Sequence, residues 1–222
     1  MSFIRKCVAE GLGTALLLAT VVGSGIMAER LTTDTALALW GNTAATGCIL
    51  VVLILIFAPI SGAHFNPAVT LAFRLRGDIT TRLALIYIAV QLIGASLGVL
   101  LAHVMFEETL IQVSQTARSG VAQWVSEAAA TFALIAAIFG CVKYKPDAVP
   151  YAVGLVITAG YWWTASTSFA NPAVTFARIF TDTFSGIAIG DAPGFILAQL
   201  LAALIFTPVL IWLFDMKRAS GE

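Results

Sequence analysis

The sequence predicts an all-α membrane protein, a bundle of six transmembrane helices plus two half-helices that come from inverted repeats. Three observations support this fold class. Hydrophobic residues make up 59% of the 222-residue chain and charged residues only 11%, whereas a soluble domain is about one-quarter charged. Several apolar runs reach the length of about 20 residues that a membrane span requires. Two shorter segments between these runs repeat the same motif around a proline.

The six predicted spans are separated by brief linkers, except for the polar linker 106–120. We interpret the first as a retained span, because it is too long for a signal peptide and lacks a convincing small-residue cleavage site. The non-spanning segments are 61–76 and 165–182. The spans themselves cover approximately residues 6–28, 38–58, 82–105, 121–142, 148–164 and 193–214.

The basic residues are distributed unevenly between the two sides that six spans create. Both termini fall on one side, and the positive-inside rule therefore places them in the cytoplasm. That side carries nine of the twelve basic residues, namely Arg5, Lys6, Arg74, Arg76, Arg82, Lys143, Lys145, Lys217 and Arg218. No basic stripe indicates a nucleic-acid partner.

The two halves of the chain, about 1–110 and 121–222, repeat one order of polar residues within a single predicted channel domain, 1–222. An odd number of spans in each half inverts the second copy, and inverted repeats place a functional site at their interface near the bilayer midplane. The repeated order is Glu10, Asn66-Pro67-Ala68 and Gln91 in the first half, and Glu127, Asn171-Pro172-Ala173 and Gln199 in the second.

Each Asn-Pro-Ala turn has the signature of a helix start. Asparagine is a strong N-cap, and proline at the first helical position is preorganised for a helix. Irregular backbone is tolerated at membrane depth only inside protein or along a water-filled cavity. Two opposed helix starts would make the midplane electropositive, which opposes cations, while the asparagine amides offer donors to neutral solutes.

The loops that lead into these turns are expected to present backbone carbonyl groups as acceptors along the pore. Small residues in such loops let the backbone approach the pore closely. The predicted pore carbonyls belong to Gly62, Ala63 and His64 in the first loop, and to Thr167, Ser168 and Phe169 in the second.

These motifs resemble the aquaporin and aquaglyceroporin family, the major intrinsic proteins, over essentially the whole chain. The resemblance rests on the Ser-Gly-Ala-His-Phe-Asn-Pro-Ala-Val-Thr segment at 61–70, the second Asn-Pro-Ala turn and the Glu and Gln pattern. It implies a right-handed helical bundle, a homotetramer with one pore per subunit, and an integral, multi-pass position in a bacterial inner membrane. It also implies that Glu10 and Glu127 anchor the re-entrant loops, a role that we favour over a proton relay.

The sequence departs from the family directly after the second turn. Most members carry arginine there, whereas this chain has Val174. Counting by the family's spacing, twenty residues before Asn66 and twelve and three before Asn171, completes the predicted selectivity filter. That filter reads Thr46, Ala159, Ser168 and Val174, with no arginine, histidine or large aromatic residue, and so predicts a wide opening.

Two further residues leave alternatives open. Arg178 could replace the missing filter charge, but a solvated arginine, or one paired near Asp182 and Asp191, is the simpler interpretation. Cys48, two residues after Thr46, could bind trivalent arsenic, although a small packing residue is the simpler interpretation.

The segment after the second turn resembles the AqpS-type bacterial aquaglyceroporins associated with arsenic resistance. That resemblance implies neutral arsenite and methylated arsenicals as cargo, beside water and glycerol-like solutes. Arsenous acid is an uncharged polyol mimic near neutral pH, which suits a wide, neutral filter. A channel for mainly water and glycerol is the alternative interpretation.

A secondary transporter is the alternative from another class, because it also uses inverted repeats and broken helices. The re-entrant turns, however, offer no acidic residue to bind a coupling ion. We expect no enzyme activity, because the two histidines accompany no nucleophile–base motif. No cofactor or metal is expected either, since the three cysteines are widely spaced.

Overall fold

The computed structural model describes residues 1–216 and contains helices but no strand within that range. Lys217 and Arg218, two of the nine basic residues expected on the cytoplasmic side, lie outside the described residues. The elements are α1 (Phe3–Leu31), α2 (Thr35–Ser61), α3 (Pro67–Arg76), α4 (Thr81–Phe106), α5 (Val121–Tyr144), η1 (Pro146–Ala148), α6 (Val149–Trp163), α7 (Pro172–Ala177), η2 (Arg178–Phe180) and α8 (Ala192–Leu213).

The six predicted spans correspond to α1, α2, α4, α5, α6 and α8. In residues 1–216, five of them are long and apolar enough to cross a membrane, and α6 is the exception with 15 residues. At 1.5 Å per residue α6 is about 22 Å long, which is shorter than a hydrocarbon core of about 30 Å. The 3₁₀ turn η1 at Pro146 directly precedes its first residue, Val149.

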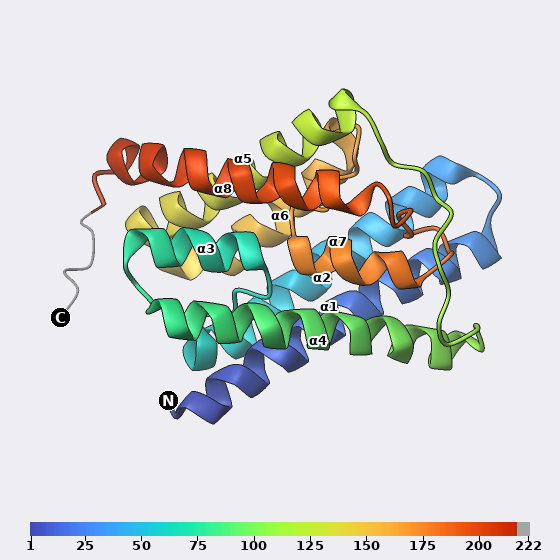
Figure 1. Cartoon of the computed structure of the whole chain (residues 1–222), viewed down its shortest axis with the longest axis horizontal. Helices are drawn as coiled ribbons and strands as arrows, with labels where there is room; N and C mark the ends of the chain where they lie inside the picture. Colours follow the sequence, from blue (N-terminus) through green and yellow to red (C-terminus); the bar gives the residue numbers. More distant parts are fainter. Residues whose placement is uncertain (217–222) are drawn as a thin grey trace.

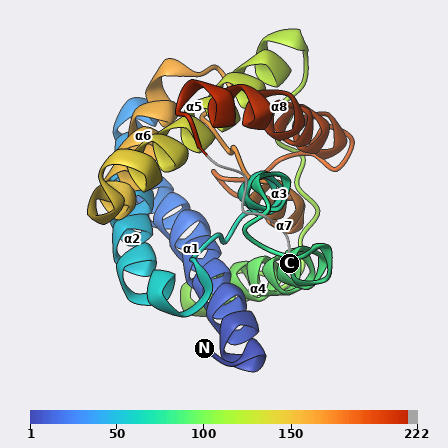
Figure 2. The ribbon, with the colours of Figure 1, turned by 90° about the vertical axis from the view of Figure 1, so that its left-hand side faces the viewer.

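The two half-helices lie end to end inside the bundle, with their N-terminal ends toward each other (Figure 1). Viewed along the bundle, α3 and α7 overlap and are surrounded by the long helices (Figure 2). The second half repeats the order of the first, since two helices, a half-helix and a further long helix follow one another in each. This arrangement confirms the predicted fold class.

The contact between α1 and α4 depends on two glycines of α4. A Cβ atom added at Gly94 would overlap the carbonyl oxygen of Gly11, and one added at Gly98 would overlap that of Ala15. The two helix backbones therefore touch here, as small residues allow in membrane bundles. The close pair belongs to the interior of one chain.

The outer surface of the bundle is strongly apolar. Many large hydrophobic side chains of the long helices are more than half exposed, which suits contact with lipid. They include Leu85, Ile93, Leu97, Leu155 and Trp212.

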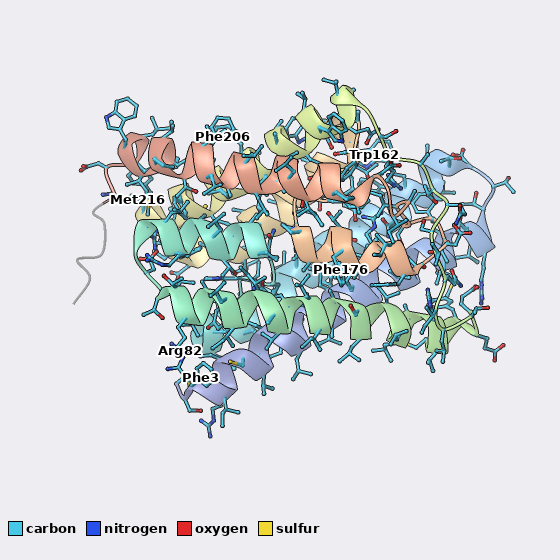
Figure 3. All side chains as sticks on the ribbon, in the orientation of Figure 1. Phe3, Arg82, Trp162, Phe176, Phe206 and Met216 are labelled. Atoms are coloured by element: carbon cyan, nitrogen blue, oxygen red, sulfur yellow. The ribbon has the colours of Figure 1, made fainter. Side chains whose placement is uncertain are left out.

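The first and last residues that the structure describes lie at one end of the bundle. Phe3 and Arg82 lie there, as does Met216, the last residue that the structure describes, whereas Trp162 lies toward the opposite end (Figure 3). The structure therefore places Arg82 at the end where the sequence predicted most of the basic residues.

Candidate functional site

Both Asn-Pro-Ala turns begin a half-helix with the same capping geometry. Asn66 Oδ1 accepts the backbone N–H of Ala68 at 2.8 Å, and Asn171 Oδ1 accepts that of Ala173 at 2.9 Å. An asparagine oxygen thereby satisfies one of the backbone donors that every helix start leaves free. Because the oxygen is turned into the helix, the amide nitrogen of each side chain points away from it.

The two amide nitrogens bind the opposite loops and so connect the two halves. Asn66 Nδ2 donates to the carbonyl oxygen of Ala170 at 2.7 Å, and Asn171 Nδ2 donates to that of Phe65 at 2.8 Å. An amide nitrogen carries two N–H groups. Each asparagine is thus held from two sides and keeps one further donor for the cavity beside it.

The first re-entrant loop is bound to the buried carboxylate of Glu10. Its Oε1 accepts the backbone N–H of His64 at 2.9 Å and the hydroxyl of Ser61 at 2.7 Å. Its Oε2 accepts the backbone N–H of Phe65 and Nε2 of Gln91, both at 2.8 Å. A fully buried charge therefore has four hydrogen-bond donors, which is what such a charge requires in an apolar interior.

The second loop is bound to Glu127 in the same manner. Glu127 Oε1 accepts the backbone N–H of Phe169 at 2.9 Å and the hydroxyl of Ser166 at 2.5 Å. Its Oε2 accepts the backbone N–H of Ala170 at 2.8 Å and Nε2 of Gln199 at 2.5 Å. Corresponding residues of the two repeats thus make corresponding bonds.

Both loops adopt left-handed backbone conformations at the same three positions, one, three and four residues before the asparagine. A residue other than glycine costs roughly 1–3 kcal/mol in this region and remains there only when its surroundings enforce it. The glutamate bonds to neighbouring N–H groups provide that enforcement. The φ angles are 95°, 52° and 49° at Gly62, Ala63 and Phe65, and 60°, 53° and 47° at Thr167, Ser168 and Ala170.

A cavity of about 640 Å³ runs past both asparagines. Its wall is mainly apolar, with a few polar groups, which is typical of a site that binds small molecules. Of the predicted site residues, Thr46, Gly62, Ala63, His64, Asn66, Ser168, Phe169, Asn171 and Val174 line it. Pro67, Ala68, Pro172 and Ala173 are buried in the packing around the helix starts.

Two of the residues predicted as filter or carbonyl positions are not on the cavity wall. Thr167 is half-buried and lies outside the lining, while Ser168 and Phe169 of the same loop belong to it. Ala159 is exposed on the outside of α6, and the cavity face of this helix instead presents Ile157 and Tyr161. The assignment of Ala159 is wrong because a shift of two residues on a helix turns a side chain through about 200°.

Tyr161 changes the expected character of the filter, because a large aromatic residue lines the cavity. Its hydroxyl donates to Thr46 Oγ1 at 3.3 Å and so connects α6 with α2. The filter is therefore not composed of small side chains alone. The sequence does contain an aromatic residue near the counted position, but the family's spacing pointed two residues away from it.

The simpler interpretation of Arg178 is also wrong, because this side chain is neither solvated nor paired with Asp182 or Asp191. It is 2% exposed and lines the cavity. The ion pairs within residues 1–216 are Arg30–Glu108 and Arg76–Asp78. Arg178 is therefore a second cavity residue that sequence reasoning had not assigned to the filter.

Cys48 is exposed on the outer surface of α2 and does not line the cavity. Its thiol is therefore not placed to bind a solute in the pore. Within residues 1–216, no three His, Cys, Asp or Glu side chains gather where they could hold a metal ion.

Comparison with known proteins shows which family the chain resembles. The major intrinsic protein family matches residues 1–148 of the chain. The chain is 56% identical to aquaglyceroporin AqpS of Rhizobium meliloti (strain 1021), over 96% of this chain and 92% of that protein. It is 32% identical to aquaporin TIP4-4 of Zea mays, over 80% of this chain and 73% of that protein.

The fold is also found among solved structures. The X-ray structure of the aquaglyceroporin from Plasmodium falciparum matches with a TM-score of 0.73 and 20% identity, covering 97% of this chain and 100% of the other. At this identity the likeness concerns the fold alone. Together, the family match, the two related sequences and the paired turns show that the chain belongs to the major intrinsic protein family of membrane channels.

Proposed function

We propose that this protein is a passive channel for small uncharged solutes, including water, glycerol-like molecules, neutral arsenite and methylated arsenicals. The observation that carries the proposal is the pair of asparagines beside one cavity, each with one amide N–H that no group within residues 1–216 accepts. A solute oxygen can accept from these donors as it passes. No covalent chemistry is required of any residue.

Charge selectivity follows from the helix ends at the same place. Each half-helix contributes roughly +0.5 elementary charge at its N-terminus. Two such ends meeting at the asparagines make the centre of the cavity unfavourable for cations, including hydronium, and they leave neutral solutes unaffected. The proposed pore residues are therefore Asn66 and Asn171, with the loop carbonyls of 62–64 and 168–169 as acceptors.

Solute size is governed, in our proposal, by the outer part of the cavity at Thr46, Ser168 and Val174. Valine lacks the length and the donors of the arginine that most family members carry there, and this favours solutes larger than water. The resemblance to AqpS-type channels supports arsenicals among them. A channel mainly for water and glycerol is the nearest alternative.

We further propose a homotetramer in the bacterial inner membrane, with both termini in the cytoplasm and Glu10 and Glu127 as loop anchors. The apolar outer surface supports a position in lipid, and Arg82 beside the N-terminal end supports the orientation.

The test is a flux panel on purified protein in liposomes. Water, glycerol, arsenite and a methylated arsenical are compared by stopped-flow light scattering and by solute uptake. Wild-type protein should conduct all of them above empty liposomes, without saturation or dependence on an ion gradient. Saturable, ion-dependent flux with a high temperature coefficient would instead identify a secondary transporter.

Val174→Arg addresses the solute range within this panel. It should reduce glycerol and methylarsenical flux more than water flux, because a longer, charged side chain narrows the outer cavity. Val174→Leu is the matched control, since it adds volume without charge and should have a smaller effect. Unchanged glycerol and methylarsenical flux in Val174→Arg would place the size restriction elsewhere.

A further inference from the structure

Among residues 1–216, Arg178 is the one charged residue that lines the cavity at the end beside Val174. It is the first residue of η2, four residues after Val174, which corresponds to a rise of about 6 Å along a helix. Both side chains line the same cavity, together with Ser168. A cationic side chain therefore lies about one turn from the residue that took the place of the usual arginine.

The guanidinium group of Arg178 is held in place by neutral partners. Its Nε donates to the carbonyl oxygen of Ser185, and its Cζ lies 3.4 Å from the centroid of the Phe169 ring. A cation over an aromatic face is attracted by the electrons of the ring. Both partners are uncharged, so the positive charge of the guanidinium is not neutralised. Within residues 1–216, neither Nη1 nor Nη2 of Arg178 makes a hydrogen bond.

The nearby carboxylates are engaged by other groups. Asp182 Oδ1 accepts the backbone N–H of Gln115, and Asp191 Oδ2 accepts that of Arg118, both at 2.8 Å. Arginine remains charged at every physiological pH. Arg178 thus contributes a full positive charge to a wall that is otherwise mostly apolar.

A second arginine beside the same ring has a different position. Arg118 Cζ lies 5.2 Å from the Phe169 centroid, but its side chain bonds to the carbonyl oxygens of Gly186 and Phe184 and does not line the cavity. Burial lowers the pKa of the Arg118 guanidinium, which still leaves it charged at neutral pH. It provides a natural comparison for Arg178.

We infer that Arg178 is the specificity-determining residue at the outer end of the pore, where its charge excludes cations and its free N–H groups bind the oxygens of neutral solutes. This inference rests on the proposed channel function. It moves the charge of the filter from the position after the second Asn-Pro-Ala turn to a position one turn further along. The valine then widens the pore without removing its electrostatic barrier.

The test measures cation leak and glycerol flux on the same liposomes. Leak of H⁺ is followed with a trapped pH dye and leak of K⁺ with a trapped K⁺-sensitive dye, each under an imposed gradient, and glycerol flux by stopped-flow. Arg178→Gln should raise the cation leak by about tenfold or more, the effect of a barrier lowered by about 1.4 kcal/mol. It should also reduce glycerol flux without abolishing it, because the neutral amide is shorter and offers fewer N–H groups to the solute oxygens. Arg118→Gln removes an equal charge beside the same ring and should leave the leak at the wild-type level.

A rescue variant separates the charge from any structural effect. Val174→Arg combined with Arg178→Gln returns a positive charge to the cavity wall and should restore cation exclusion. Arg178→Lys keeps the charge and should exclude cations even if Arg178→Gln fails to fold. Size-exclusion profiles and thermal unfolding show which variants fold.

Three results would overturn the inference: a folded Arg178→Gln variant that conducts glycerol and remains cation-tight, a folded Arg178→Lys variant that leaks cations, or an equal leak in Arg118→Gln. Absence of glycerol flux in the wild-type protein would instead remove the proposed function itself. The two failures are therefore distinguishable.

Discussion

The two re-entrant segments of this protein share one backbone design but differ in the side chains at their ends. In both, a buried glutamate accepts two loop N–H groups, a hydroxyl and a glutamine amide, and an asparagine caps the half-helix that follows. The residue directly after each turn is also the same, Val69 and Val174, and both line the cavity. The centre of the site is therefore close to symmetric.

The difference lies in a pair of touching residues, two before and seven after each asparagine. In the first half His64 stacks on Phe73 with ring centroids 4.6 Å apart, and in the second Phe169 lies beneath Arg178. All four line the cavity. The comparison teaches that the repeat forms the loops and the central amide donors twice. The touching pairs differ, because the pair of the second half contains a permanently charged side chain, Arg178, and the pair of the first half does not.

The largest effect should come from the shared anchors. Glu10→Gln and Glu127→Gln each replace a carboxylate, whose two oxygens only accept hydrogen bonds, with an amide. The amide nitrogen cannot accept the loop N–H or glutamine N–H group that one carboxylate oxygen accepts in the wild-type protein. Because buried donors then lose their partners, we expect the free energy of unfolding to fall by about 3 kcal/mol or more in both variants. Thermal unfolding in detergent measures this loss.

The matched control for the anchors is Glu108→Gln, because Glu108 is partly exposed and pairs with Arg30 near the surface. Surface pairs of this kind contribute about 0–1 kcal/mol. A loss confined to one of the two anchor variants would mean that the halves are not equivalent.

A middle-sized effect is expected at the two asparagines. Asn66→Ala and Asn171→Ala each remove a helix cap, worth about 0.5–2 kcal/mol, together with one bond to the opposite loop. Stability should decrease by a similar amount in both, and cation leak through the liposomes should increase because the opposed helix starts are no longer held together. If only one variant leaks cations, the barrier to cations at the centre of the cavity depends on the asparagine of that half alone.

The smallest effect is expected at the residue that differs between the loops. His64→Phe places the residue type of position 169 into the first loop and removes the bond between His64 Nδ1 and Thr70 Oγ1, which is 3.1 Å long. Stability should change by about 1 kcal/mol or less, and glycerol flux should remain near the wild-type value. A large loss of flux would show that the imidazole contacts the solute.

Much of the site could be predicted from local sequence. Asparagine followed by proline specifies a helix start through the asparagine oxygen and the fixed proline φ, and both starts occur where they were expected. The polar linker 106–120 and the apolar spans follow equally from composition. These features depend on residues that are neighbours in the chain, and they can therefore be predicted from the sequence alone.

The errors occurred where rotation about a helix decides the outcome. Counting by the spacing of related proteins selected Ala159, but the end of α6 turns Tyr161 toward the cavity and Ala159 outward. A small uncertainty in register reverses the direction of a side chain, because each residue turns the helix by about 100°. No local signal in the sequence resolves that direction.

Arg178 shows the same limit for a charged residue. Two aspartates close in sequence suggested an ion pair, yet their oxygens accept backbone N–H groups of the 106–120 linker. That linker meets the second re-entrant segment only in the folded chain, where Ser114 donates its N–H to the carbonyl oxygen of Ile179 at 3.0 Å. The partners of Arg178 were thus decided by contacts between distant segments.

By itself, the sequence determined that this protein lies in a membrane, that it is built from two inverted halves, and that each half contains a capped half-helix, because hydrophobic length, repeat order and capping are local or additive properties. Only the tertiary structure decided which side chains face the cavity and that Arg178 has no carboxylate partner there within residues 1–216. The physical reason is that the direction of a side chain and the availability of a counter-charge depend on helix rotation and on segments that meet only after folding.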